Sequence, residues 1–274
     1  MDAASTQSRR LTHLGTRGLD VIRYIGGMAL LLQETARAAA GVLASRPHRA
    51  SAAAHLARQV VRLGIRSVGI VALVQFFVGV ILALQMAPPL EPFGYVSMVA
   101  NIIGVAVFRE LGPLISAIVL CGFAGASIAA ELGAMVVGEE VEALEAHAIS
   151  PVRFLILPRL AGTVIAMICL CVVADLAGCL GGYLSSLLVI GPAAHLGYWA
   201  RIAEQLTVGD FLTGLIKAGV FGLILGLLAC FEGLRVRGGA EGVGRATTMT
   251  VVYTIISLVL VDCLFTVLFF VCKL

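Results

Sequence analysis

Phe108-Arg109-Glu110-Leu111-Gly112-Pro113 opens the stretch that decides how this chain folds, because it sets a charged pair and a proline inside apolar sequence. The stretch continues through Ala129-Ala130-Glu131-Leu132-Gly133 to the acidic run Gly138-Glu139-Glu140-Val141-Glu142-Ala143-Leu144-Glu145. It closes with Ser150-Pro151 and Pro158-Arg159. Charged residues inside a membrane are costly and are usually functional. Intramembrane charge followed by a short acidic helix indicates a transporter subunit that is driven by something outside itself.

The composition places the chain among polytopic membrane proteins. Hydrophobic residues make up 60% of the 274 residues, charged residues only 13%, and the mean hydropathy is +1.03. Soluble domains carry about a quarter charged residues. We therefore expect an all-α, polytopic membrane protein with one membrane domain. The net charge of +3 is small and does not suggest nucleic-acid binding.

Hydropathy predicts five spans after a polar N-terminal part. Residues 1–18 are predicted to form a disordered cytoplasmic start, and 19–66 to form interfacial helices, the second of them basic and covering 51–66. The predicted spans within the single permease domain, 19–274, are approximately 67–87, 96–130, 152–190, 211–231 and 249–272.

Prolines and charges modify two of these spans. Pro88-Pro89 are predicted to stop the first one. The second is too long to cross the bilayer as one straight helix, and Pro113 with the Arg109-Glu110 pair predicts that it is bent or discontinuous. Basic residues lie mostly on alternate loops, with ten arginines before residue 67. The positive-inside rule then predicts a cytoplasmic N-terminus, a cytoplasmic acidic run and an external C-terminus.

The acidic run is predicted to form a coupling helix that presses into a groove on a cytoplasmic partner. Its apolar residues fall at i, i+4, i+7 and i+11, on one helical face: Val137, Val141, Leu144 and Ala148. Its acidic residues occupy the other positions: Glu139, Glu140, Glu142 and Glu145. The alternative is a solvated loop helix without a partner.

Charged residues inside the spans form the second candidate site. They are Arg109, Glu110, Lys217 and Asp262, to which we add the polar Gln85 of the first span. Either these groups neutralise one another inside the bundle, for example Lys217 with Asp262, or Arg109 and Lys217 face a cavity and contact an anionic headgroup. A further acidic residue, Asp175, lies in the third span.

Catalytic and metal-binding motifs are missing from the sequence. The glycine-rich Gly238–Arg245 stretch lacks the Gly-Lys-Ser/Thr that holds phosphate and Mg²⁺, so we expect no ATP hydrolysis by that route. The sequence has no His-Glu-x-x-His, and no second histidine lies at ligand spacing from His147. None of the seven cysteines forms a Cys-x-x-Cys pair, which indicates packing residues.

At these residues the chain resembles the MlaE/YrbE family of permeases, which belong to ABC transporters associated with MCE proteins. The similarity extends from about residue 20 to the C-terminal end. The stretches that carry it are Phe108–Pro113, Ala129–Met135, Glu139–Glu145, Ser150-Pro151 with Pro158-Arg159, and Gly244–Thr248.

The resemblance implies a homodimer in the bacterial inner membrane that moves phospholipids or related hydrophobic molecules between that membrane and the outer envelope. Two cytoplasmic ABC ATPase subunits, which use ATP and Mg²⁺, would dock around Glu139–Ala148, and this chain itself would bind no cofactor. A periplasmic MCE-domain hexamer would cover the dimer, and the family also allows a small STAS-domain protein on the ATPase. Arg109, Glu110, Lys217 and Asp262 match charged positions of the family, which favours the cavity interpretation.

The chain departs from the family pattern in places. Cys121-Gly122-Phe123 stands where the family usually has Ala-Gly-Arg, so an aromatic ring replaces a cation. The alternative function is an ion-gradient-driven secondary transporter or channel that uses Asp175, Lys217 or Asp262. No inverted repeat, the usual mark of such folds, is visible in the sequence.

Overall fold

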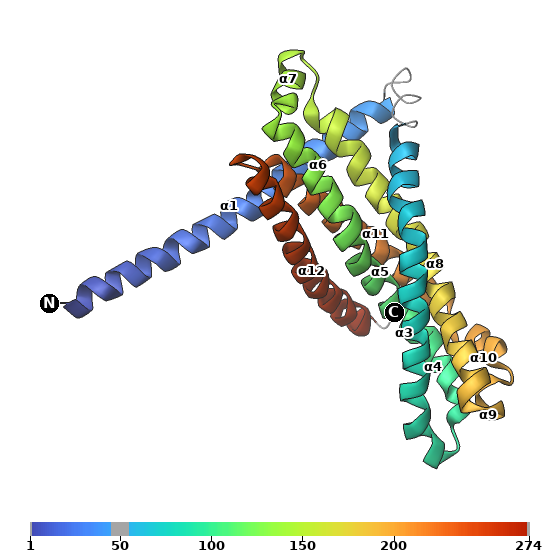
Figure 1. Ribbon diagram of the computed structural model, residues 1–274. Coiled ribbons are helices and arrows are strands. Elements are labelled where there is room, and N and C mark those ends of the chain that lie inside the picture. The colour runs from blue at the N-terminus through green and yellow to red at the C-terminus, as the bar shows by residue number, and fades with distance from the viewer. Residues whose placement is uncertain (1, 45–54, 273–274) are drawn as a thin grey trace.

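The computed structural model describes residues 2–44 and 55–272, and within these ranges all regular structure is helical (Figure 1). Five helical stretches are long and apolar enough to cross a membrane: His55–Phe93, Val96–Val137, Val152–Ile190, Val208–Leu234 and Gly239–Cys272. The predicted all-α, polytopic architecture with five spans is therefore confirmed. The first, second, fourth and fifth spans extend beyond their predicted limits on at least one side, and the third covers 152–190 as predicted.

The N-terminal part differs from the prediction. Helix α1 covers Asp2–Ala44, so residues 2–18, predicted to be disordered, are helical. This range contains no proline, and each added residue gains a hydrogen bond once a helix has started. In Figure 1 the N-terminal half of α1 extends away from the other helices. An interfacial position of α1 is defined relative to the membrane, so this part stays a prediction.

Of the basic helix predicted for 51–66, the described residues 55–66 form the beginning of the first span. Residues 55–60 and the π-helical turn Val61–Ile65 lead without interruption into α3, Arg66–Leu90, while residues 45–54 lie outside the described ranges. Pro88 and Pro89 lie inside the last turn of α3 and do not stop it before Leu90. Arginine can lie at the start of a membrane span because its long side chain reaches the polar interface.

The second span is one continuous helix, so of the two predicted alternatives, bent or discontinuous, the structure excludes the discontinuous one. It consists of α4 (Val99–Ala106), a π-helical turn (Val107–Leu111), α5 (Gly112–Leu120), a second π-helical turn (Cys121–Gly125) and α6 (Ala126–Val137). In the first π-helical turn the Gly112 N–H donates to the Val107 carbonyl, five residues back. Pro113 has no N–H to donate, and it follows directly after this wider turn without ending the helix.

The remaining elements return the chain across the bundle. Helix α7 (Glu140–Ala146) connects the second span to the third, which comprises the π-helical turn Val152–Ile156, α8 (Leu157–Ser185) and the π-helical turn Ser186–Ile190. Two short helices, α9 (Pro192–His195) and α10 (Tyr198–Gln205), lead to α11 (Val208–Leu234). Helix α12, Gly239–Cys272, is the last. In Figure 1, α7 lies at one end of the bundle and α9 and α10 at the other.

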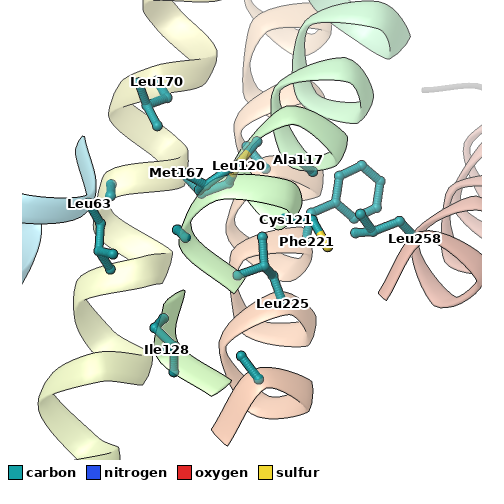
Figure 2. Packing of buried hydrophobic residues seen from close by; sticks show 14 of the residues in the cluster. Leu63, Ala117, Leu120, Cys121, Ile128, Met167, Leu170, Phe221, Leu225 and Leu258 are labelled. Atoms are coloured by element: carbon teal, nitrogen blue, oxygen red, sulfur yellow. The ribbon is translucent and has the colours of Figure 1, made fainter. Parts of the chain in front are cut away.

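The core is formed where α5, α6, α8, α11 and α12 meet (Figure 2). Met167 and Leu170 of α8 and Phe221 and Leu225 of α11 are almost completely buried there. Leu258 of α12 is also buried and is the point at which the last span joins this core. Because lipid is as apolar as leucine, such contacts stabilise the bundle through close packing.

Helices α3 and α8 approach each other backbone to backbone. A Cβ atom on Gly79 of α3 would overlap the carbonyl oxygen of Gly178 in α8, and one on Gly181 would overlap the carbonyl oxygen of Phe76. Small residues allow this distance between helices in a membrane. The close approach of the first and third spans therefore depends on these glycines.

We predict that Gly79→Ala lowers the free energy of unfolding by about 1–3 kcal/mol, because the added methyl group forces the two backbones apart. Gly69→Ala on the same helix is the matched control, since no atom lies within 4 Å of its would-be Cβ. The measurement is the thermal unfolding midpoint of both variants in the same detergent. Equal midpoints for the two variants would contradict the close contact.

Tyr24 attaches α1 to the C-terminal end of α11 and to the first half of α12. Its hydroxyl donates to Glu232 Oε1 over 2.6 Å, and its ring makes edge contacts with Phe231 and Tyr253 at centroid distances of 5.1 and 5.5 Å. The guanidinium of Arg235 lies 5.5 Å from the Tyr24 ring centroid. Burial raises the pKa of Tyr24 above its ordinary value, and the Glu232 carboxylate raises it further. The hydroxyl therefore stays protonated and remains a donor.

We expect Tyr24→Phe to loosen α1, because it removes a hydrogen bond to a charged group while keeping the ring contacts. Such a bond contributes about 1.5–3 kcal/mol, so amide hydrogen exchange in α1 should accelerate about tenfold. Tyr95→Phe, at an exposed position after the first span, is the control. Unchanged exchange between residues 22 and 35 in the Tyr24 variant would refute this attachment.

Candidate functional site

Lys217 lies at the centre of the intramembrane charged residues. Its side chain on α11 is 1% exposed, and its Nζ donates to Glu110 Oε2 at 2.6 Å and to Asp262 Oδ1 at 3.0 Å. Thr266 Oγ1 lies 3.4 Å from the same nitrogen and donates to Glu110 Oε1 at 3.0 Å. The ring of Phe269 lies 5.8 Å from Nζ. We call Glu110, Lys217, Asp262 and Thr266 the lysine cluster.

The lysine cluster joins three elements and uses the full donor capacity of the ammonium group. An ammonium carries three N–H donors, and Lys217 has three acceptors within hydrogen-bonding distance. The predicted pairing of Lys217 with Asp262 is present, and Glu110 is added as a second carboxylate. In this conformation Lys217 therefore has no N–H group left for an anionic headgroup, and the interpretation as mutual neutralisation describes its geometry.

Arg109 points away from this cluster. Its Nη1 donates to Asp210 Oδ1 over 2.9 Å, near the start of α11. The other oxygen of Asp210 accepts hydrogen bonds from the backbone N–H and the hydroxyl of Thr207, which together form a capping box at the start of α11. Asp210 was not among the predicted site residues, although the spacing Thr207-x-x-Asp210 before an apolar run is a visible capping signal.

Two other polar residues of the spans stay outside the lysine cluster. Gln85 lies exposed on α3 and takes part in none of its hydrogen bonds, so the structure does not bring it to the other predicted residues. Asp175 is buried on α8, where Cys171 Sγ lies 3.7 Å from its Oδ2, and among the described residues its Oδ1 has no hydrogen-bond partner. The candidate site therefore consists of the lysine cluster and the Arg109–Asp210 pair.

The predicted apolar ridge of the coupling helix faces the chain itself. Val141 and Leu144 of α7 are partly buried against the hydrophobic core. Val137 ends α6, and Ala148 follows α7 in a left-handed conformation with φ of 57°, so neither continues the α7 helix. The predicted single face through all four residues is wrong, because the chain turns at Glu139, which also has a positive φ of 59°.

The surface available around α7 is acidic with apolar neighbours. Its exposed acidic residues are Glu139, Glu140, Glu142 and Glu145. The exposed apolar residues next to α7 in the chain are Val137 and Ile149, with exposed fractions of 45% and 42%. Because α7 lies at the end of the bundle, this acidic surface can be reached from outside the membrane (Figure 1).

Phe123, where the resemblance leads us to expect a cation, belongs to the π-helical turn Cys121–Gly125 and is 45% exposed. Among the described residues, no group of three histidine, cysteine or carboxylate side chains is arranged to hold a metal ion.

Comparisons with known proteins show to which family this chain belongs. The family model Permease MlaE matches residues 56–268. A probable ABC transporter permease protein of Rickettsia felis is 38% identical over 215 residues, which cover 78% of this chain and 82% of the relative. The intermembrane phospholipid transport system permease protein MlaE of Haemophilus influenzae is 29% identical over 261 residues, covering 95% of this chain and 97% of that protein. Protein TRIGALACTOSYLDIACYLGLYCEROL 1 of Arabidopsis thaliana, a chloroplastic protein, is 30% identical over 78% of this chain and 61% of its own length.

We predict that Lys217→Met destabilises the protein by about 3 kcal/mol, because two carboxylates lose their shared cation. This is the lower end of the usual range, since Glu110 is about one third exposed and screened. Adding Glu110→Gln and Asp262→Asn should recover most of the loss, because no unpaired charge then remains. The thermal unfolding midpoints of the single and the triple variant in detergent measure the loss and its recovery. A triple variant that is less stable than Lys217→Met would contradict the neutralising role of the lysine cluster.

Proposed function

The chain belongs to the MlaE permease family, and on this premise we propose that it is the permease subunit of an ABC transporter that moves phospholipids. The cargo would travel between the bacterial inner membrane and the outer envelope, with energy from a separate cytoplasmic ATPase. The name of the Haemophilus influenzae relative, which specifies intermembrane phospholipid transport, supports phospholipid as the cargo. The names of the Rickettsia relatives support the ABC transporter.

The proposal rests on one observation. The carboxylates on α7 are exposed at the surface, whereas the charged groups of the candidate site within the spans are paired with one another. The chain lacks the Gly-Lys-Ser/Thr sequence that would let it hydrolyse ATP as P-loop enzymes do. The energy for transport then enters from a partner or from an ion gradient, and the exposed carboxylates of α7 offer a surface for a partner with basic residues around its groove. The apolar contacts of Val141 and Leu144 fix α7 to the bundle, so force on α7 reaches the spans.

The assembly that we propose is a homodimer in the inner membrane with a cytoplasmic N-terminus and a periplasmic C-terminus. One ATPase subunit docks on α7 of each protomer, a periplasmic MCE-domain hexamer covers the opposite side, and the ATPase can carry a STAS-domain protein. Helix α12 suits a seam with a second copy, because large apolar side chains along it are exposed, among them Leu260, Leu264 and Val267. ATP binding would move α7 and open a lipid cavity at the dimer axis.

The lysine cluster and the Arg109–Asp210 pair hold together the helices that form the wall of this cavity. Because their charges are paired within the chain, the wall can lie in the membrane without an isolated charge. The ion-gradient alternative would need one of these groups, or Asp175, to bind and release an ion during transport.

The proposal is tested by reconstituting the protein with its ATPase into vesicles that contain a fluorescent phospholipid. We expect lipid transfer that requires ATP and is absent with the permease alone. Transfer by the isolated chain under a proton or sodium gradient, with no effect of ATP, would refute the ABC permease and support the gradient-driven transporter.

The docking surface is tested by Glu142→Lys combined with Glu145→Lys. Both residues are exposed on α7, so reversing their charge should weaken ATPase association at least tenfold through like-charge repulsion while leaving the fold intact. Leu144→Asp is unsuitable for this purpose, because Leu144 packs on the core of its own chain.

Co-purification of the ATPase with each variant measures this association. Glu204→Lys on α10, at the other end of the bundle, is the control for a change of surface charge. Full ATPase recovery with the α7 double variant would exclude the acidic surface as the docking site.

A further inference from the structure

A second ion cluster connects the first three spans near α7. Arg62 Nη1 donates to Glu131 Oε2 over 3.0 Å, and Arg62 Nη2 donates to Glu131 Oε1. Ser127 Oγ donates to the same Oε1 over 3.1 Å, and Arg159 Nη2 lies 3.6 Å from Oε2. Both oxygens of Glu131 are thus occupied. We call Arg62, Ser127, Glu131 and Arg159 the ionic strap.

The ionic strap ties three spans through one carboxylate. Arg62 lies in the π-helical turn Val61–Ile65 before α3, Glu131 in α6, and Arg159 near the start of α8. A bidentate contact between guanidinium and carboxylate fixes orientation as well as distance. The side chain of Arg159 is 11% exposed, and Glu131 is the carboxylate with which it pairs. Removing the Glu131 charge would therefore release the first span from α6 and leave a buried cation behind.

The position of Glu131 in the chain connects the strap to the docking surface. Glu131 lies in the last two turns of α6, and α6 leads through Gly138 and Glu139 into α7. Val141 and Leu144 of α7 also pack on the core together with Val152, which begins the third span. A displacement applied to α7 thus reaches α6 directly, and the strap is the polar connection from α6 to the first span.

We propose that Glu131 is a positioning residue for ATP-driven transport. The strap makes α6 and the starts of the first and third spans move together when the ATPase displaces α7. Without the strap, α7 and α6 move while the first span stays behind, so ATP is hydrolysed with less lipid moved. This inference rests on the proposed function and concerns a residue that neither the acidic surface nor the lysine cluster contains.

The test compares lipid moved per ATP hydrolysed in reconstituted vesicles that contain the permease and its ATPase. Glu131→Gln should lower this ratio about threefold or more, while ATPase binding stays unchanged. Arg62→Lys keeps the charge but loses the two-pronged contact, so it should lower the ratio as well. Glu241→Gln, which removes a carboxylate from an exposed pair with Arg245, is the matched control and should keep the wild-type ratio.

A ratio in Glu131→Gln equal to that of the wild type would overturn the proposal. A parallel fall of lipid transfer and ATP hydrolysis, with the ratio unchanged, would overturn it too, because that result indicates only a structural role. Wild-type protein that moves no lipid on ATP addition would instead refute the proposed function, so the two failures are distinguishable.

Discussion

A buried ammonium group within the spans is the constraint on which the rest of the structure depends. Lys217 is almost inaccessible, and a charge at such a position is tolerated only when carboxylates neutralise it. Glu110 and Asp262 do so from the second and fifth spans, which brings three helices together at one point. The adjacent Arg109 is directed to Asp210 at the start of α11. The π-helical turn that carries Arg109 and Glu110 is therefore held to α11 twice.

The sequence predicts part of this arrangement from charge alone. The rarity of charge in the spans identified Lys217 and Asp262 as candidate partners, and they are paired in the structure. The second carboxylate could not be assigned, because the direction of Glu110 depends on a π-helical turn that no local pattern indicates. Asp210 was missed for a different reason, since a capping residue was not considered as an ion-pair partner, although its spacing from Thr207 was visible.

The predicted limits of the helices failed where tertiary packing overrides local rules. Prolines 88, 89 and 113 were expected to end or interrupt helices, yet the chain continues through all three. The acidic helix α7 is a second case in which tertiary packing differs from the local pattern. Of its four predicted apolar positions only Val141 and Leu144 lie on α7, and they cover the bundle rather than a partner. Sequence periodicity shows which side is apolar, and only the structure shows what covers it.

These features describe a permease in which the charged residues of the candidate site form ion pairs with one another. Its acidic surface, with four exposed carboxylates, lies around α7. The most direct test is mass spectrometry of the intact assembly, purified from its native membrane in mild detergent, with its bound lipids identified. We expect two copies of this chain together with a nucleotide-binding subunit and bound phospholipid. A chain that is recovered alone, without a nucleotide-binding subunit and without phospholipid, would contradict this expectation.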